Sequence, residues 1–149
     1  MRFLGNKEKK KLIELLPKGY IFLKKDEIKE EDNILYKNSE KYLICEVDNN
    51  DKKEIKYLPH LKSIPKDKYK SVYVDRGAIP FIIKGADLMR PGIVKIEDEI
   101  KKEEIVMIKD EEHNKLLALG FSLFNSNDMK NQEKGKSVQI YHYFNDDKY

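Results

Sequence analysis

The sequence of 149 residues contains one cysteine, no tryptophan and only three arginines among 30 basic residues. A single thiol, Cys45, excludes an intramolecular disulfide framework and any paired-cysteine zinc or redox motif. No apolar run approaches the ~18 residues that a membrane-spanning helix needs. The first residues also lack the apolar stretch and the cleavage site of a signal peptide. We therefore expect a cytoplasmic protein with no membrane partner.

Residues that commonly carry catalysis or bind metals are few and scattered. His60, His113 and His142 lie far apart, and no carboxylates accompany them at the spacing of metal ligands. Cys45 lies in the strand-like run YLICEV, which predicts a buried, inert thiol. No GxSxG motif and no paired acid and base are present. The sequence therefore predicts no enzyme, no metal and no cofactor.

The net charge of +3 is small but unevenly distributed. Residues 1–70 contain 18 Lys and Arg against 13 Asp and Glu, a balance of +5, whereas residues 71–149 contain 12 against 14, a balance of −2. A broadly basic coat over the whole chain is thus excluded. Any contact of the second half with a polyanion must use a local basic patch.

The first half predicts a small α+β unit that ends near Lys70. Asn6 is a candidate N-cap, and the helix after it should bury Leu12, Ile13, Leu15 and Leu16. The remaining expected elements are strands at 20–23, 34–36, 41–47 and 55–58, a turn at 48–54 and a short helix that starts at 58–61.

The second half predicts a small, mainly β barrel. Its expected strands are 71–75, 93–96, 105–108, 116–124 and 137–144. A short helix should lie between Gly77 and Gly85, and a second should begin after the N-cap Asn125 and stop at Gly135. On the last strand, His142 is expected to pack in the core. Its neighbours Tyr141 and Tyr143 point the opposite way, as base-stacking faces or as plain surface aromatics.

The glycine-rich stretch VDRGAIPFIIKGADLMRPG is the most informative segment. It matches neither nucleotide-binding glycine motif, so its glycines serve either tight turns or close approach to a phosphate backbone. Arg76, Lys84 and Arg90 are spaced through this otherwise apolar stretch. Guanidinium and ammonium groups beside glycine turns suit phosphate contacts, although solvated surface charges would give the same pattern.

Three motifs in the second half carry a family resemblance. VDRGAIPFIIKGADLMRPGI, LALGFSLFNSNDM and EKGKSVQIYHYFND occur in order and resemble the PUA domain, an RNA-binding module. With YLPHLK in the preceding α+β unit, the chain resembles the malignant T-cell-amplified sequence family in its short archaeal form. The implied domains are a pre-PUA domain at 1–71 and a PUA pseudo-barrel at 72–149.

The resemblance also implies a function and a site. Members of that family act in translation without catalysis and bind the small ribosomal subunit and tRNA, so structured RNA and a translation-factor protein are the implied partners. Carried over to this sequence, the RNA-binding residues are Arg76, Gly77, Lys84, Gly85, Ala86, Arg90, Lys134 and Lys136.

Other functions fit the same sequence. A ribosome-biogenesis factor can also join an α+β domain to a PUA domain, and a PUA domain can serve as part of an accessory subunit of an RNA-modifying enzyme. The glycine-rich stretch could also bind another polypeptide. Co-sedimentation with one ribosomal subunit, a tRNA modification assay and nuclease-insensitive association would separate these alternatives.

Overall fold

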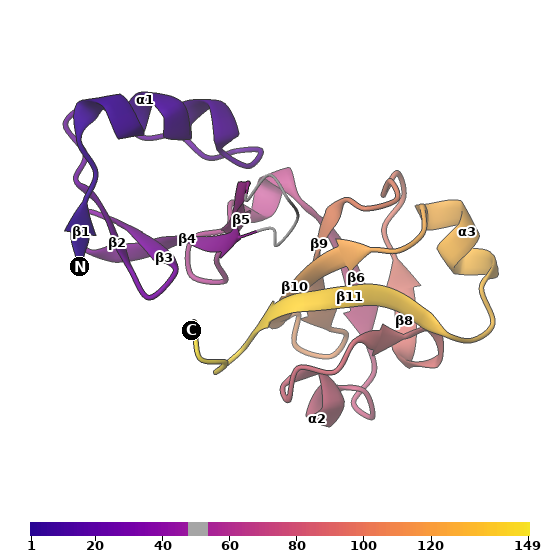
Figure 1. Ribbon diagram of the computed structural model, residues 1–149. Helices are drawn as coiled ribbons and strands as arrows, with labels where there is room; N and C mark the ends of the chain where they lie inside the picture. The colour runs from indigo at the N-terminus through magenta and orange to yellow at the C-terminus, as the bar shows by residue number, and fades with distance from the viewer. Residues whose placement is uncertain (48–53) are drawn as a thin grey trace. The chain divides into compact units, whose positions relative to one another are not determined.

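A computed structural model describes residues 1–47 and 54–149 of the chain. The chain divides into two compact units, the N-terminal unit Met1–Lys68 and the C-terminal unit Tyr69–Tyr149 (Figure 1). Of the turn expected at 48–54, residues 48–53 lie outside the described part. Within residues 1–47 and 54–149, no helix is long and apolar enough to cross a bilayer.

The N-terminal unit is an antiparallel sheet with one long helix. The sheet order is β1-β2-β3-β4-β5. Tight turns at Asp32-Asn33 and Asn38-Ser39 join β2 to β3 and β3 to β4, and all four residues have positive φ. Such turns match the right-handed twist of paired strands. The elements are β1 (Arg2–Phe3), α1 (Asn6–Leu15), β2 (Ile28–Glu31), β3 (Ile34–Lys37), β4 (Glu40–Val47), β5 (Ile55–Pro59) and the 3-10 turn η1 (Lys66–Lys68).

Several expectations for this unit are wrong. Gly5, not Asn6, is the residue before α1, and of the expected apolar face only Leu12 is fully buried, while Ile13 and Leu15 are exposed. Residues 20–23 form no strand. Tyr20 and Phe22 are buried in alternation, as in a strand, but hydrogen bonds within the loop, such as Leu23 N–H to Asp26 at 2.7 Å, replace a ladder.

Two further corrections concern β2 and β5. No strand was expected between residues 23 and 34, where the charged run DEIKEED lies, yet Ile28–Glu31 forms β2. One buried isoleucine and the following positive-φ turn suffice for pairing with β3. The helix expected at 58–61 is absent, since Leu58 and Pro59 end β5. Proline is tolerated there because β5 is an edge strand.

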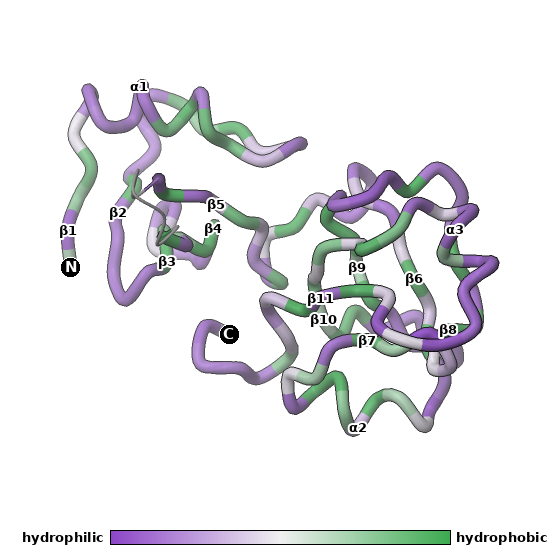
Figure 2. The backbone as a smooth tube through the Cα atoms, turned by 45° about the vertical axis from the view of Figure 1, so that its right-hand side comes forward, coloured by the Kyte–Doolittle hydropathy of each residue, from purple (hydrophilic) through white to green (hydrophobic). Residues whose placement is uncertain are grey.

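The C-terminal unit is a curled six-stranded half-barrel of order β7-β11-β10-β9-β6-β8. Only the β6–β9 pair is parallel. Buried apolar residues from the strands fill one core, which includes Val72, Val106, Ile108, Leu117 and Val138, and the green segments of the tube run along these strands (Figure 2). The elements are β6 (Lys70–Val74), α2 (Ile79–Ile82), β7 (Leu88–Met89), the 3-10 turn η2 (Arg90–Gly92), β8 (Ile93–Ile96), β9 (Ile105–Asp110), β10 (Leu116–Ser122), α3 (Ser126–Asn131) and β11 (Lys136–Tyr143).

The expected α+β class with a mainly β second half is thus confirmed. One strand was missed: β7 lies between the helix expected at Gly77 to Gly85 and the strand expected at 93–96, where no strand was predicted. Gly135 does not stop α3, which ends at Asn131. Instead Gly135 adopts φ +90° in the loop before β11. The structure confirms Cys45 as a buried thiol, and burial raises the pKa of Cys45 to about 12.

Asn125 caps α3 as the sequence predicts. Its Oδ1 accepts a hydrogen bond from the Asp128 N–H at 2.8 Å. Because alanine offers no acceptor, we expect Asn125→Ala to lower the free energy of unfolding by about 1 kcal/mol. Chemical denaturation would measure the loss. Asn125→Asp, which keeps the acceptor, should lose only a few tenths of that amount, and equal losses in both variants would contradict the cap.

Candidate functional site

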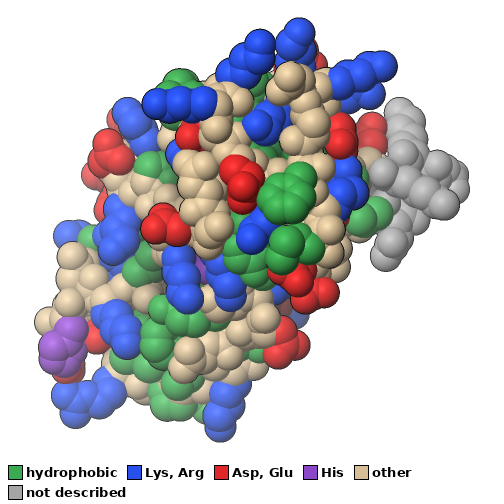
Figure 3. Space-filling view, turned by 90° about the vertical axis from the view of Figure 1, so that its left-hand side faces the viewer, with side chains coloured by type: hydrophobic (Ala, Val, Ile, Leu, Met, Phe, Trp, Pro, Cys, Tyr) green, Lys and Arg blue, Asp and Glu red, His purple; other side chains and the backbone are tan. Residues whose placement is uncertain are grey.

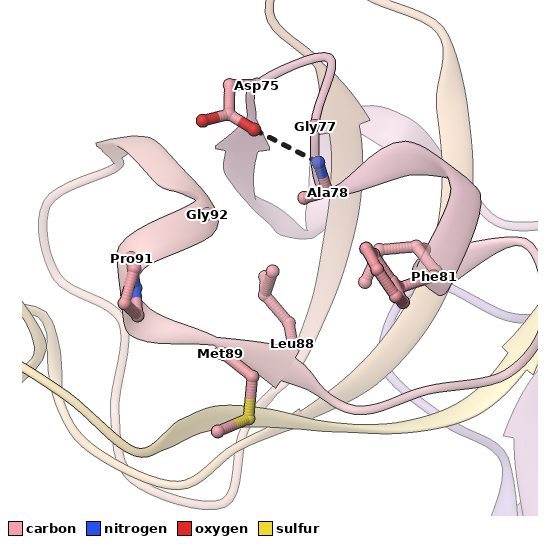
Figure 4. Close-up of a pocket in the computed structure, with 9 residues that line it drawn as sticks. Asp75, Gly77, Ala78, Phe81, Leu88, Met89, Pro91 and Gly92 are labelled. Carbon is pink, nitrogen blue, oxygen red and sulfur yellow. Dashed lines mark hydrogen bonds between the residues drawn. The ribbon is translucent and has the colours of Figure 1, made fainter.

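The glycine-rich segment, residues 75–92, folds around an apolar pocket of about 410 Å³ (Figure 4). Phe81 and Met89 stand on its border with 65% and 46% of their surface exposed. Ile82 and Leu88 are buried beneath them. The residues that line the pocket are Asp75, Gly77, Ala78, Phe81, Ile82, Leu88, Met89, Pro91 and Gly92.

Backbone contacts between the two ends of the segment shape this pocket. The Asp75 N–H donates to the Gly92 carbonyl at 3.1 Å, which joins the end of β6 to the end of η2. A Cβ at Gly92 would lie 2.9 Å from the Ala78 Cβ, so no side chain fits there. The Asp75 Oδ1 accepts from the Ala78 N–H at 3.0 Å and fixes the turn that leads into α2. The turn geometry thus accounts for the glycine at position 92 and for one of the two oxygens of Asp75.

The local structure also explains why position 85 is a glycine. It ends the turn after α2 with φ +90°, and a Cβ there would lie 2.7 Å from the Tyr143 ring. Tyr143 therefore covers Gly85 and packs against the core of the unit. On the same strand His142 is fully buried, as the sequence predicts, and the Tyr141 ring lies 5.2 Å from that of Phe121.

Exposed basic side chains lie close to the lining residues, either as neighbours in the sequence or as partners on the paired strand. Arg76 lies between two lining residues and is 81% exposed. Lys84 follows Phe81 by three positions, and Lys136 is paired with Met89 across β11 and β7. Lys134 lies in the loop whose Gly135 carbonyl accepts from the Arg90 N–H at 2.8 Å. We call Arg76, Lys84, Lys134 and Lys136 the basic rim.

Two members of the basic rim form surface ion pairs. Arg76 donates to both Glu112 oxygens at 2.9 and 3.1 Å, and this hydrogen-bonded partner raises the pKa of the guanidinium. The Lys136 Nζ lies 3.2 Å from Asp87, whose other oxygen accepts from the Ile140 N–H. Exposed pairs of this kind contribute little stability, so a phosphate can replace the carboxylate at small cost.

Arg90 differs from the other predicted cations. Its Nε donates to the Met129 carbonyl at 2.8 Å and its Nη1 to the Ile93 carbonyl at 3.2 Å. The guanidinium thus joins the end of α3 to β8, and we assign it a positioning role. Of the other predicted residues, Gly77 lines the pocket, whereas Gly85 and Ala86 follow α2 and do not line it.

The sequence did not single out the apolar border. Phe81 and Met89 look like core residues in a string of apolar letters, and only the fold shows that they are exposed. The sequence did not single out Asp75 as a site residue either. Among residues 1–47 and 54–149, no group of three or more His, Cys, Asp or Glu side chains is arranged to hold a metal.

Comparison with known protein families identifies the fold of the C-terminal unit. The family model described as the PUA domain matches residues 70–144, about half of the chain, and the chain therefore belongs to the PUA domain family. The chain is similar to a solved PUA domain structure from Aeropyrum pernix, with a TM-score of 0.75 at 26% sequence identity. That similarity covers 98% of this chain and 86% of the other.

The chain is also similar in sequence to several individual proteins. The chain is 45% identical over 98 residues to an uncharacterized protein of Methanocaldococcus jannaschii, a match that covers 64% of this chain and 60% of that protein. It is 34% identical to translation machinery-associated protein 20 of Schizosaccharomyces pombe and 30% identical to the malignant T-cell-amplified sequence 1 homolog of Drosophila melanogaster. Each of these two matches covers 60% of this chain and 52% of the relative. The chain thus spans about half of the length of these curated relatives.

Proposed function

We propose that this chain is a non-enzymatic RNA-binding protein of the translation machinery that holds tRNA or small-subunit ribosomal RNA through its PUA domain. One observation carries the proposal: the family-matched unit contains an apolar pocket with exposed large side chains on its border and a basic rim beside it. Relatives named for the translation machinery support the setting.

The two kinds of group serve different parts of an RNA. Ammonium and guanidinium groups of the basic rim neutralise phosphates, which gives most of the affinity. Exposed Phe81 and Met89 offer apolar surface to a base that is not stacked in a helix, as in single-stranded ends and loops. Because residues 71–149 have a balance of −2, binding depends on this local arrangement.

Residues 1–71 would serve as a pre-PUA domain, and residues 72–149 as the RNA-binding domain. The excess of five positive charges in residues 1–70 would attract ribosomal RNA over a distance of about 10 Å at moderate salt. Lysines are spread over the face of the molecule drawn in Figure 3. A protein factor of translation and a cytoplasmic location complete the proposal.

Removing two rim lysines tests the phosphate contacts. Lys84 and Lys134 are exposed, and no ion pair of the described residues uses them. We expect Lys84→Ala/Lys134→Ala to weaken tRNA binding about 30-fold near 0.15 M salt and to reduce the slope of log K against log salt by about 2. Fluorescence anisotropy with labelled tRNA over a salt series would measure both quantities.

A matched control removes the same charge elsewhere in the C-terminal unit. Lys101 and Lys102 are exposed in the turn between β8 and β9. Lys101→Ala/Lys102→Ala should change the affinity less than threefold, on the order of a weak long-range effect. Equal losses in the two double variants would refute the site, and absence of tRNA or subunit binding by the unaltered chain would refute the function.

A further inference from the structure

Asp75 is an acidic side chain in the lining of an otherwise apolar pocket. One oxygen, Oδ1, accepts from the Ala78 N–H at 3.0 Å. The second oxygen points away from that hydrogen bond, and no hydrogen bond or ion pair among the described residues uses it (Figure 4). Among the lining side chains, the pocket thus offers one free carboxylate oxygen as an acceptor and no N–H or O–H donor.

The chemistry of the lining decides which part of an RNA fits inside. A carboxylate repels phosphate, so phosphates belong at the basic rim and not in the pocket. A carboxylate has only acceptor oxygens and therefore selects a group with an N–H donor. The apolar walls from Phe81, Leu88 and Met89 suit the flat faces of a base, and the volume of about 410 Å³ can hold one.

We propose that Asp75 makes the pocket selective for a nucleobase that presents an exocyclic amino group, through its free carboxylate oxygen. The inference rests on the proposed RNA-binding function. A cationic side chain of a protein partner would also match a carboxylate, but Arg76, Lys84 and Lys136 adjoin the pocket and repel it. An RNA satisfies both features at once, with phosphates on the rim and an amino group at Asp75.

The test compares two short RNAs that differ in one amino group. The probes are pentauridine with a central adenosine and the same pentamer with a central purine riboside, which lacks the amino group. We expect the unaltered chain to bind the adenosine pentamer about tenfold more tightly, the ratio that one hydrogen bond to a charged group supports. Isothermal titration or anisotropy would give both affinities.

Asp75→Ser separates the proposed contact from the turn. A serine hydroxyl can still accept from the Ala78 N–H, as in ST turns, but it brings no second oxygen. We expect this variant to bind both pentamers equally, while the affinity for the purine riboside pentamer falls no more than threefold. Asp98→Ser is the control for lost negative charge. Asp98 is an exposed carboxylate bound to Lys130, and its variant should keep the tenfold ratio.

The possible results distinguish a failure of the proposed role of Asp75 from a failure of the proposed RNA-binding function. A wild-type ratio near one, or a tenfold ratio that persists in Asp75→Ser, would overturn the role of Asp75 while salt-dependent RNA binding stands. A basic peptide that binds through Asp75 in place of the pentamers would also overturn it. If neither the pentamers nor tRNA binds to the unaltered chain, the proposed function itself fails.

Discussion

Gly120→Ala is expected to lower the free energy of unfolding of the C-terminal unit by about 3 kcal/mol, the upper range for overpacking a core. Gly120 lies in β10 beside a register shift in its pairing with β11. A Cβ there would lie 2.5 Å from the Gln139 carbonyl oxygen and 2.6 Å from the Val138 Cγ1. Because one obstacle is backbone, the strands must separate to admit a methyl group. Urea denaturation followed by circular dichroism would measure the loss.

Two further variants make this prediction specific. Gly77→Ala adds a Cβ that would lie 3.4 Å from the Asp75 Oδ1, an ordinary contact, so its stability should stay within about 0.5 kcal/mol of the unaltered chain. Gly120→Ala/Val138→Ala removes the side-chain obstacle but keeps the carbonyl. Its loss should be smaller than the sum of the two single losses, and strict additivity would contradict the close approach of the strands.

The second large effect concerns the carboxylate that fixes the chain after β11. The Asp146 Oδ2 accepts from the Tyr143 N–H at 3.0 Å and lies 2.7 Å from the Nδ1 of buried His142, while Oδ1 accepts from the Lys148 N–H at 2.8 Å. Burial alone would raise the pKa of Asp146, but the hydrogen bonds from Tyr143 and His142 outweigh it, so the pKa lies below its ordinary value.

Asp146→Asn should therefore lower the free energy of unfolding by about 2 kcal/mol at pH 7, because hydrogen bonds to a charged group are replaced by weaker ones. A depressed pKa stabilises the folded chain above the pKa of the unfolded carboxyl, near 3.9, and that stability is lost as the pH falls through the folded value. The difference between the two proteins should shrink steadily from about pH 5 to pH 2.

Denaturation midpoints over a pH series would measure this difference. The control is Asp147→Asn. It removes a neighbouring carboxylate that is exposed and that forms no hydrogen bond with any residue in the described part of the chain. It should change stability by less than about 0.5 kcal/mol at every pH. A pH-independent loss in Asp146→Asn would show that shape, not charge, holds the segment.

The sequence alone determined the class of the fold and most of its elements. Short apolar runs in 71–75 and 105–108 and the alternating residues in 137–144 match β6, β9 and β11, because the apolar pattern of a strand reflects which of its faces are buried. The cap at Asn125 was also predictable, since it is a local interaction over three residues. The ordered motifs of the second half indicated the PUA family correctly.

Expectations failed where local preference was not decisive. Ile28–Glu31 is mostly charged, and its pairing with β3 is set by the turn that joins them. Residues 20–23 show strand-like alternation but pair with no strand in the described part of the chain. Their backbone groups form hydrogen bonds with side chains and within turns instead. Both outcomes depend on which strands lie next to the segment, and the sequence of the segment alone does not reveal this.

The candidate site shows the same division. The sequence identified the glycine-rich segment and its cations, because glycine and arginine are conspicuous in an apolar stretch. Only the tertiary structure decided that Arg90 binds two carbonyls, that Tyr143 covers Gly85, and that Phe81, Met89 and Asp75 meet at one pocket. These outcomes join residues up to about 60 positions apart, and which side chains meet over such separations is fixed by the pairing of strands and not by local spacing.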